Sequence, residues 1–412
     1  MSEQDGRKAI AQQRPTTHDQ DEWQAYWDTL GQPWRTEPEI DAERQKYLVE
    51  RRRITPNIEQ GIYPFQDVQL TRADIEWLLA THEEGRGPIF WSRDNNPRRM
   101  GLDLRGADLR HINMRGLPLA FMRGGLFLDQ WLRATEEQRN MAAVQLQGAT
   151  LRSAQLQGAY LRSAQLQGAY LRGAQLQGAY LKSAQLQGAY LSRSDLDGAS
   201  LDGVTLSDGT YGSVLVADVR WGEVNLAVVD WGHVTRLGDE QKAHQKKDSD
   251  GETKDNRTRI DDYKEALRAN RQLALVLREQ GLNEVADHFA YRAQLLQRKV
   301  LWHQHEFGRW LFSVLLALLS GYGYRIWRIL AAYIVMVSLF ALAYFVLGIY
   351  YAPHLPLDQA FLESITAFHG RVFLEQFSPN TPQIWFTALE ALAGLIIEGV
   401  FIAMLIQRFF GK

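Results

Sequence analysis

The last quarter of the chain contains two long apolar stretches. Ile329–Tyr350 runs for 22 residues without a charge, and Ile384–Gln407 runs for 24 residues interrupted only by Glu390 and Glu398. An α-helix rises about 1.5 Å per residue, so each stretch is long enough to cross the roughly 30 Å hydrocarbon core of a bilayer. The pattern predicts two membrane-spanning helices.

A shorter pattern lies between these two stretches. Tyr351–Gln383 is too short and too mixed in polarity for a soluble domain, but Pro356–Phe368 begins with proline and places its apolar residues at helical spacing. A short helix and a turn between two spans predict a re-entrant hairpin. Non-helical backbone at membrane depth is tolerated only where it lines water or is buried in protein.

One face of the second span combines small and acidic residues with bulky apolar ones. At about 100° per residue these residues fall within a stripe of about 100°: Thr387, Glu390, Ala391, Gly394, Glu398, Phe401 and Leu405. The part from Thr387 to Glu398 is small or acidic and predicts the lining of a pore. Phe401 and Leu405 are bulky and apolar and predict a gate that closes by dewetting. Ordinary helix packing, with the glutamates paired to His369, Arg371 or a neighbouring subunit, explains the same face.

The middle of the chain follows a different period. Leucine recurs at every fifth position from Leu146 to Leu206, thirteen in all, and alanine stands two residues before it from Ala149 to Ala189. A looser form of the frame begins near residue 101 and continues to Trp231, interrupted by a helical insert at about 122–142. Periods of 3.6 and 2.0 do not explain this spacing, and a fixed internal period indicates a solenoid.

The repeat resembles the pentapeptide-repeat family, whose unit is A-(D/N)-L-x-x. Gly106–Arg110 reads G-A-D-L-R and Gly158–Arg162 reads G-A-Y-L-R. The resemblance implies a right-handed quadrilateral β-helix, with four five-residue sides per coil and with leucine and the small residue pointing inward. Glutamine or tyrosine here replaces the usual Asp or Asn before the leucine, so backbone satisfaction by a short side chain would be weaker.

The strict section has a ten-residue unit, LRSAQLQGAY. Its tyrosines should alternate between two opposite faces and, with the glutamines, form ladders along the rod. Some pentapeptide-repeat proteins mimic DNA through an acidic surface, but Leu146–Ser194 holds five basic residues and no acidic one. The ladders would therefore form either a face for an unidentified protein partner or the surface of a rigid spacer.

Helical patterns flank the solenoid. Thr71 as N-cap and Asp74 three residues later predict a helix over Arg72–Glu83. Asp261–Gln280 and Asn283–His305 predict a hairpin that resembles one tetratricopeptide unit. The expected domains are an N-terminal polar and helical cytosolic region (1–100), the β-helix (101–235), a charged flexible linker (236–259), the hairpin (260–306), an interfacial segment (307–328) and a two-span pore domain (329–412).

The interfacial segment precedes the first span. Trp310–Leu319 is apolar but too short to cross a bilayer. A helix lying in the interface, with aromatic and basic residues at headgroup level, would be anchored by Trp310, Arg325, Trp327 and Arg328. Its position resembles that of the slide helix of inward-rectifier-type channels.

The C-terminal region as a whole resembles the two-transmembrane-helix ion-channel superfamily that includes potassium channels. The segment aligned with the T-V-G-Y-G filter comprises Thr366, Ala367, Phe368, His369 and Gly370, followed by Arg371. Phe368 replaces the middle glycine, so a potassium-selective carbonyl ladder is not expected. His369 and Arg371 would favour anions whereas the inner glutamates favour cations, which leaves the permeant ion open; pairing with Glu363 or Glu375 is the alternative role.

Net charge and composition argue against some classes of protein and of binding site. A net charge of −2 and a pI near 6.6 argue against a general nucleic-acid binder. The absence of cysteine excludes disulfides and thiolate metal sites. The polar N-terminus shows no secretory signal, and basic residues before the first span and after the second predict an inner (plasma) membrane protein with both termini cytoplasmic.

These patterns favour an oligomeric ion channel with membrane lipids and a permeant inorganic ion as partners. Two spans per subunit require several copies, and a homotetramer is what the channel resemblance implies. The alternative is a membrane-anchored scaffold that binds a partner protein without conduction. We expect no enzyme, cofactor or metal site, because the sequence has no phosphate loop, no metal cluster and no nucleophile with a base at motif spacing.

Overall fold

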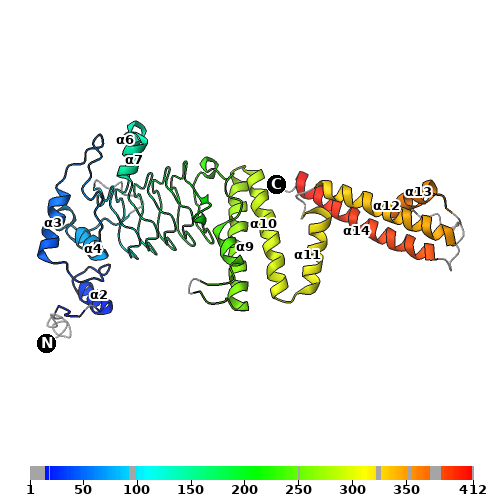
Figure 1. Ribbon diagram of the computed structural model, residues 1–412, viewed down its shortest axis with the longest axis horizontal. Coiled ribbons are helices and arrows are strands. Elements are labelled where there is room, and N and C mark those ends of the chain that lie inside the picture. Colours follow the sequence, from blue (N-terminus) through cyan, green and yellow to red (C-terminus); the bar gives the residue numbers. More distant parts are fainter. Residues whose placement is uncertain are drawn as a thin grey trace, which may run out of the picture. The chain divides into compact units, whose positions relative to one another are not determined.

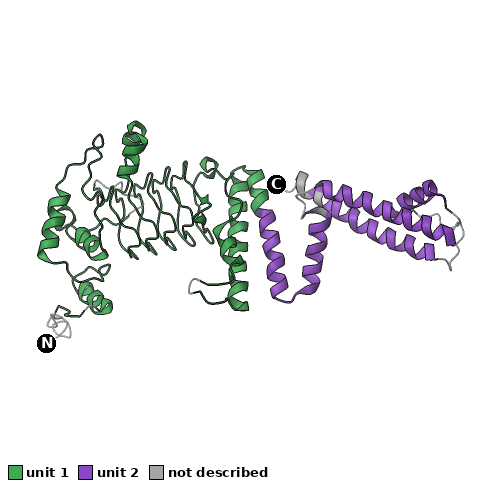
Figure 2. Cartoon of the chain, in the orientation of Figure 1, with its two compact units in different colours: residues 1–289 green, residues 290–412 purple. Residues whose placement is uncertain are grey.

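The computed structural model describes residues 14–17, 19–91, 99–248, 251–321, 326–350, 355–371 and 382–410. The chain divides into two compact units, Met1–Phe289 and Ala290–Lys412 (Figure 2). The first holds the five-residue repeat and the helices that flank it. The second holds the long apolar helices.

The repeat folds as a β-helix. Parallel bridges join residues 20 positions apart, such as Gln145 with Gln165 and Thr150 with Tyr170, at every fifth residue along the strict section (Figure 1). Twenty residues per coil are four sides of five, as the period predicts. The leucines and alanines of the repeat form the core, and Leu161 and Ala164 are both fully buried. Each side is too short for a regular strand, so bridges replace strands.

A tight turn forms each corner. Ala149 N donates to Leu146 O at 3.0 Å, and Gly148, the second of the two residues between them, has φ +63°. Serine takes this position in other turns and adopts the same left-handed backbone, as at Ser153 with φ +54°. Glycine or serine therefore holds most of the corner positions, where the chain turns from one side of the coil to the next.

The predicted ladders are present. Tyr160 stacks on Tyr180 with ring centroids 4.9 Å apart, and Tyr170 stacks on Tyr190 at 4.7 Å. Glutamine side chains also bond from coil to coil, as Gln147 donates to Gln165. In the earlier coils Asp or Asn accepts the N–H two residues later, for example Asp108 from Arg110 at 3.2 Å. In the strict section glutamine or tyrosine takes the place of that short polar side chain, and it contacts the next coil instead.

Two insertions interrupt the coils. Asp108 bridges to Gln145, 37 residues away, because α6 (Leu128–Arg133) and α7 (Glu136–Ala142) enter between successive coils. Tyr190 bridges to Leu215, 25 residues away, because the hairpin of β1 (Ser207–Asp208) and β2 (Gly212–Ser213) adds five residues. The β-helix continues in register after both.

Helices cover the first end of the β-helix: α2 (Gln20–Thr29), α3 (Ala42–Arg52), α4 (Arg72–Ala80) and α5 (His82–Gly85). Thr71 and Asp74 form the predicted capping box. The helix from Arg72 ends at Ala80 rather than at Glu83, because Glu83 adopts a left-handed backbone with φ 46°. A bridge from Gln69 to Asp108 joins this region to the first coils.

The other end of the β-helix is closed by 3₁₀ helix η1 (Leu226–Val228) and helix α8 (Gly238–His244), followed by α9 (Asn256–Glu279) and α10 (Asn283–His303). Residues 236–259, expected to form a flexible linker, thus contain a packed helix and the start of another. Asp239 and Glu240 of α8 are buried. The charged composition suggested a solvated linker, but the Asp239 side chain accepts hydrogen bonds from backbone N–H groups.

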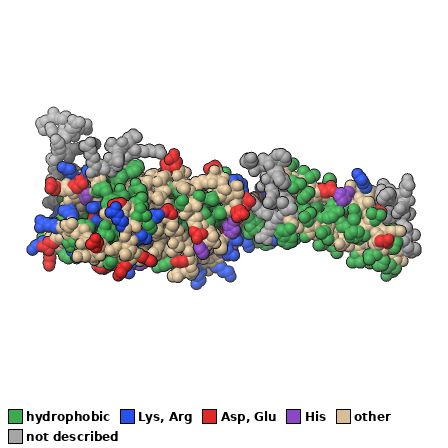
Figure 3. All heavy atoms as spheres, turned by 90° about the horizontal axis from the view of Figure 1, so that it is seen from above, with side chains coloured by type: hydrophobic (Ala, Val, Ile, Leu, Met, Phe, Trp, Pro, Cys, Tyr) green, Lys and Arg blue, Asp and Glu red, His purple; other side chains and the backbone are tan. Residues whose placement is uncertain are grey.

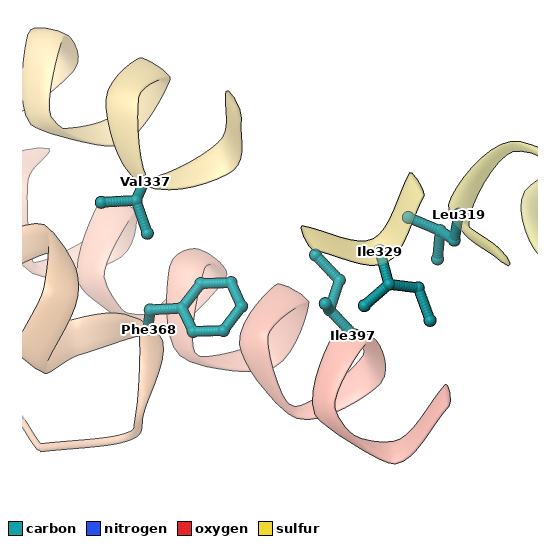
Figure 4. Packing of buried hydrophobic residues seen from close by; sticks show 5 residues of the cluster. All are labelled: Leu319, Ile329, Val337, Phe368 and Ile397. Carbon is teal, nitrogen blue, oxygen red and sulfur yellow. The ribbon is translucent and has the colours of Figure 1, made fainter. Parts of the chain in front are cut away.

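The second unit contains α11 (Phe307–Ser320), α12 (Ile326–Tyr350), α13 (Leu357–Phe368) and α14 (Pro382–Phe410). Its core joins all four helices through Leu319, Ile329, Val337, Phe368 and Ile397 (Figure 4). Trp327–Tyr350 and Pro382–Ala403 are long and apolar enough to cross a membrane. Phe307–Leu319 is apolar but shorter, as expected for the interfacial segment.

Candidate membrane site

The second unit places polar side chains inside and apolar side chains outside. Its visible face is largely hydrophobic, whereas charges are scattered over the first unit (Figure 3). Leu318, Leu395 and Trp385 are each more than two-thirds exposed. The buried polar residues come from α13 and α14: Glu363, Ser364, Gln383, Thr387 and Glu390. A water-soluble unit normally has the opposite arrangement.

Glu390 lies at the centre of these polar residues. It is fully buried, and Tyr344 Oη of α12 donates to its Oε2 at 2.8 Å. Ser364 Oγ of α13 contacts its Oε1 and also lies 2.9 Å from Val337 O. A serine hydroxyl has one hydrogen, so both contacts are full hydrogen bonds only when Glu390 carries a proton and donates to Ser364. The carboxyl thus ties α12, α13 and α14 together.

Within one chain, the residues predicted to line the pore lie mostly against α13. Thr387 and Glu390 are buried, and Gly394 packs so tightly that an added Cβ would lie 1.9 Å from Phe368 O. The helical wheel grouped these residues correctly, but their face meets α13 rather than open space. The reason is that α13 supplies Ser364 and a close backbone contact, which complement a small and polar face.

The two residues predicted to form the gate lie near the C-terminal end of α14. Phe401 is half-buried and packs against the core cluster of the second unit. Leu405 lies one turn further along the same face of α14 and is also half-buried. Within this chain, Phe401 therefore contributes to the contact between helices, and the gate stays a prediction.

Glu398 and His369 remain exposed. His369 Nε2 lies 3.6 Å from Glu398 Oε1, and the side chains are 45% and 42% exposed. The other imidazole nitrogen of His369 contacts Ile365 O at 2.8 Å. Two residues that the sequence placed in different parts of a pore, the loop and the lining, therefore lie beside each other at the C-terminal end of α13.

The rest of the predicted selectivity loop is helical. Thr366, Ala367 and Phe368 are the last residues of α13, and Arg371 N donates to Thr366 O at 2.9 Å. Gly370 N donates to Ala367 O at 2.9 Å. These two carbonyls are engaged within the turn, and the segment does not present a row of free carbonyls. Arg371 is exposed, and its suggested partner Glu375 lies outside the described residues.

The predicted interfacial anchors are partly described. Trp310 is half-buried and its ring lies 5.0 Å from that of Trp302. Trp327 is 64% exposed, and Arg328 Nη1 donates to Ala317 O at 3.2 Å. Arg325 lies outside the described residues.

Sequence reasoning missed Tyr344 and Ser364, the two partners of Glu390. The available signal was weak, because a lone hydroxyl in an apolar segment has many possible partners. Throughout the described ranges, no group of three or more His, Asp or Glu side chains could hold a metal ion.

Comparison with known proteins identifies the repeat. The family model "Pentapeptide repeats" matches residues 140–178 and 169–208, with eight copies. No curated protein matches the chain. The chain is similar to solved pentapeptide repeat proteins at low identity.

HetL, involved in heterocyst differentiation regulation in Nostoc sp. strain PCC 7120, is 16% identical over 38% of this chain and 73% of its own, with a TM-score of 0.18. Rfr23 from Cyanothece 51142 is 22% identical over 29% and 79%, with a TM-score of 0.10. An Arabidopsis thaliana thylakoid lumen protein is 19% identical over 40% and 92%, with a TM-score of 0.09. Because these TM-scores are low, the assignment rests on the repeats and their bridges. The chain therefore carries a pentapeptide-repeat β-helix, followed by two helices long and apolar enough to cross a membrane.

Proposed function

We propose that the chain is one subunit of an oligomeric ion channel. Helices α12 and α14 cross the membrane, α13 is a re-entrant helix between them, and the β-helix is a cytosolic scaffold or sensor. Two spans cannot enclose a pore, so the conduction path lies between copies. A tetramer is what the resemblance to two-helix channels implies.

The exposed pair of His369 and Glu398 is the observation that carries this proposal. It lies on a unit whose other exposed side chains are largely apolar, next to residues that belong in the hydrocarbon core. Charged side chains within membrane spans are costly and usually face a bundle interior or water. Glu398 lies within the second candidate span, Pro382–Ala403. The pair therefore needs water or a neighbouring subunit beside it, and a simple two-helix anchor needs neither.

The buried polar cluster has a separate role in this proposal. The contacts of Glu390 with Tyr344 and Ser364 hold α13 against both spans. This places the C-terminal end of α13, with His369, at a fixed position beside Glu398. The lumen is then lined by the exposed pair, and the buried glutamate is structural.

Single-channel recording in planar bilayers with asymmetric KCl tests the proposal. Glu398→Gln should change the conductance or the reversal potential, because it removes a charge from the lumen. Asp358→Asn removes an equally exposed charge from the other end of α13 and should leave both unchanged. The sign of the wild-type reversal potential decides between anions and cations. Conductance steps that are identical in wild type and Glu398→Gln would reject this lumen.

A membrane-anchored scaffold is the second candidate, and the exposed tyrosine ladders favour it. Tyr170 and Tyr180 are 36% and 37% exposed and belong to regular stacks. Such a surface suits a protein partner. Folded, oligomeric protein that stays silent under membrane tension and across a pH change would support this candidate over the channel.

A further inference from the structure

A groove in the second unit lies between α10, α11 and α12. Its volume is about 560 Å³, and each helix contributes one face to it. Leu295 of α10, Leu318 of α11 and Val335 of α12 give it apolar walls, and Leu318 and Val335 are largely exposed. Exposed apolar walls around a hollow of this size suit a long apolar ligand better than water.

Two arginines line the same groove, and no carboxylate does. Arg298 extends from α10 and Arg328 from α12. Arg328 donates to Ala317 O at 3.2 Å, and its guanidinium lies 5.8 Å from the centre of the Trp327 ring. Among the described residues, no ion pair to a carboxylate is formed by either arginine. The groove thus combines apolar walls with two cations that lack an acidic counterpart.

The chain segment that forms most of the groove is poor in acidic residues that could pair with these arginines. From His288 to Leu357 the chain has six lysine and arginine residues and one acidic residue, Glu306. Glu306 is already paired with Arg309 at 2.9 Å on the exposed surface of α11. Neither Arg298 nor Arg328 has an acidic partner among the described residues, and a ligand that is anionic at one end and apolar at the other fits both features of the groove.

We propose that this groove binds an anionic phospholipid from the surrounding bilayer. The headgroup phosphate lies against Arg298 and Arg328, where the guanidinium forks match phosphate oxygens. An acyl chain follows Leu295 and Val335. Trp327 begins the first candidate span and is exposed, as expected for a ring at headgroup level. The inference rests on the membrane insertion in the proposed function but not on conduction.

Native mass spectrometry of protein from nanodiscs provides the test. Discs contain phosphatidylcholine alone or phosphatidylcholine mixed with phosphatidylglycerol. Wild type should retain phosphatidylglycerol preferentially. Arg298→Gln and Arg328→Gln should each lower that retention about fivefold, since one basic residue near a bilayer surface contributes about that factor. Arg309→Gln also removes an arginine, but it lies outside the groove and should retain lipid as wild type does.

The outcomes separate this inference from the channel. Equal retention by wild type and by both groove variants, all monodisperse and equally helical by circular dichroism, overturns the lipid site. Equal protection by soluble glycerol phosphate against thermal unfolding also overturns it, because the ligand would then be a free phosphate. Selective retention by a protein that conducts no ions would keep the lipid site and reject the channel. A chain released from membranes by alkaline wash would reject both.

Discussion

Single glycines show how tightly the β-helix constrains its surface. Gly158 and Gly173 occupy the same turn position of the repeat and share a left-handed backbone, with φ +63° and +70°. An added Cβ at Gly158 would lie 2.5 Å from a Phe121 ring carbon, whereas at Gly173 the nearest atom, Ser153 Oγ, would be 3.6 Å away. Serine already holds this position elsewhere in the repeat, so backbone strain alone does not exclude it.

These distances predict opposite results for one substitution. Gly158→Ser should lower the free energy of unfolding by about 1–3 kcal/mol, because the Phe121 ring must move. Gly173→Ser should change it by less than about 1 kcal/mol, because the site is open and the residue is used in equivalent turns. Denaturant unfolding of the two variants beside wild type measures the difference. Equal destabilisation would show that the backbone conformation, and not the ring contact, decides the cost.

At the scale of elements, α8 shows how the β-helix is closed. Its Asp239 is 2% exposed and accepts from Val216 N at 2.7 Å and from Ala217 N at 3.2 Å. These N–H groups belong to the last coils, where no further coil follows to accept them. Burial raises the pKa of the Asp239 carboxyl to about 7, and the nearby charge of Glu265 adds to that effect, although the N–H donors oppose it.

A raised folded-state pKa makes this cap sensitive to pH. The stabilising contribution is fully present below the unfolded pKa of about 4 and is lost as the pH rises through about 7. Its upper bound is about 4 kcal/mol. Asp239→Asn cannot ionise, so its unfolding midpoint should change less between about pH 4 and about pH 8 than that of wild type. The exposed Glu223→Gln serves as control and should retain the wild-type pH dependence.

The elements also show what the sequence could predict. A five-residue period gives the length of one side, and the family resemblance adds four sides per coil, which makes 20 residues; the capping box at Thr71 needs only local geometry. What the small and polar face of α14 contacts could not be predicted in this way. A helical wheel places Thr387, Glu390 and Gly394 on one face of α14. That face is equally compatible with a water-filled lumen and with a polar partner helix. Only the position of Ser364 on α13, set by tertiary packing, distinguishes them.

At the scale of the whole molecule, the two units differ in the kind of surface they expose. In the second unit α12 and α14 expose leucine, isoleucine and tryptophan along their lengths, while the polar groups of α13 and α14 are buried. The first unit buries its leucines and alanines in the β-helix and exposes polar residues. Membrane attachment should therefore depend on α11–α14 alone.

This difference predicts how the chain partitions after alkaline carbonate washing of membranes. The full chain should stay in the pellet, because exposing α12 and α14 to water would uncover a large apolar surface. A fragment that ends at His305, before α11, should move to the supernatant and keep the circular dichroism of a folded β-helix. Phe307–Lys412 expressed alone should remain in the pellet. A fragment 1–305 that stays with the membrane would mean that the first unit or α10 has its own membrane contact, and the spans would no longer explain attachment.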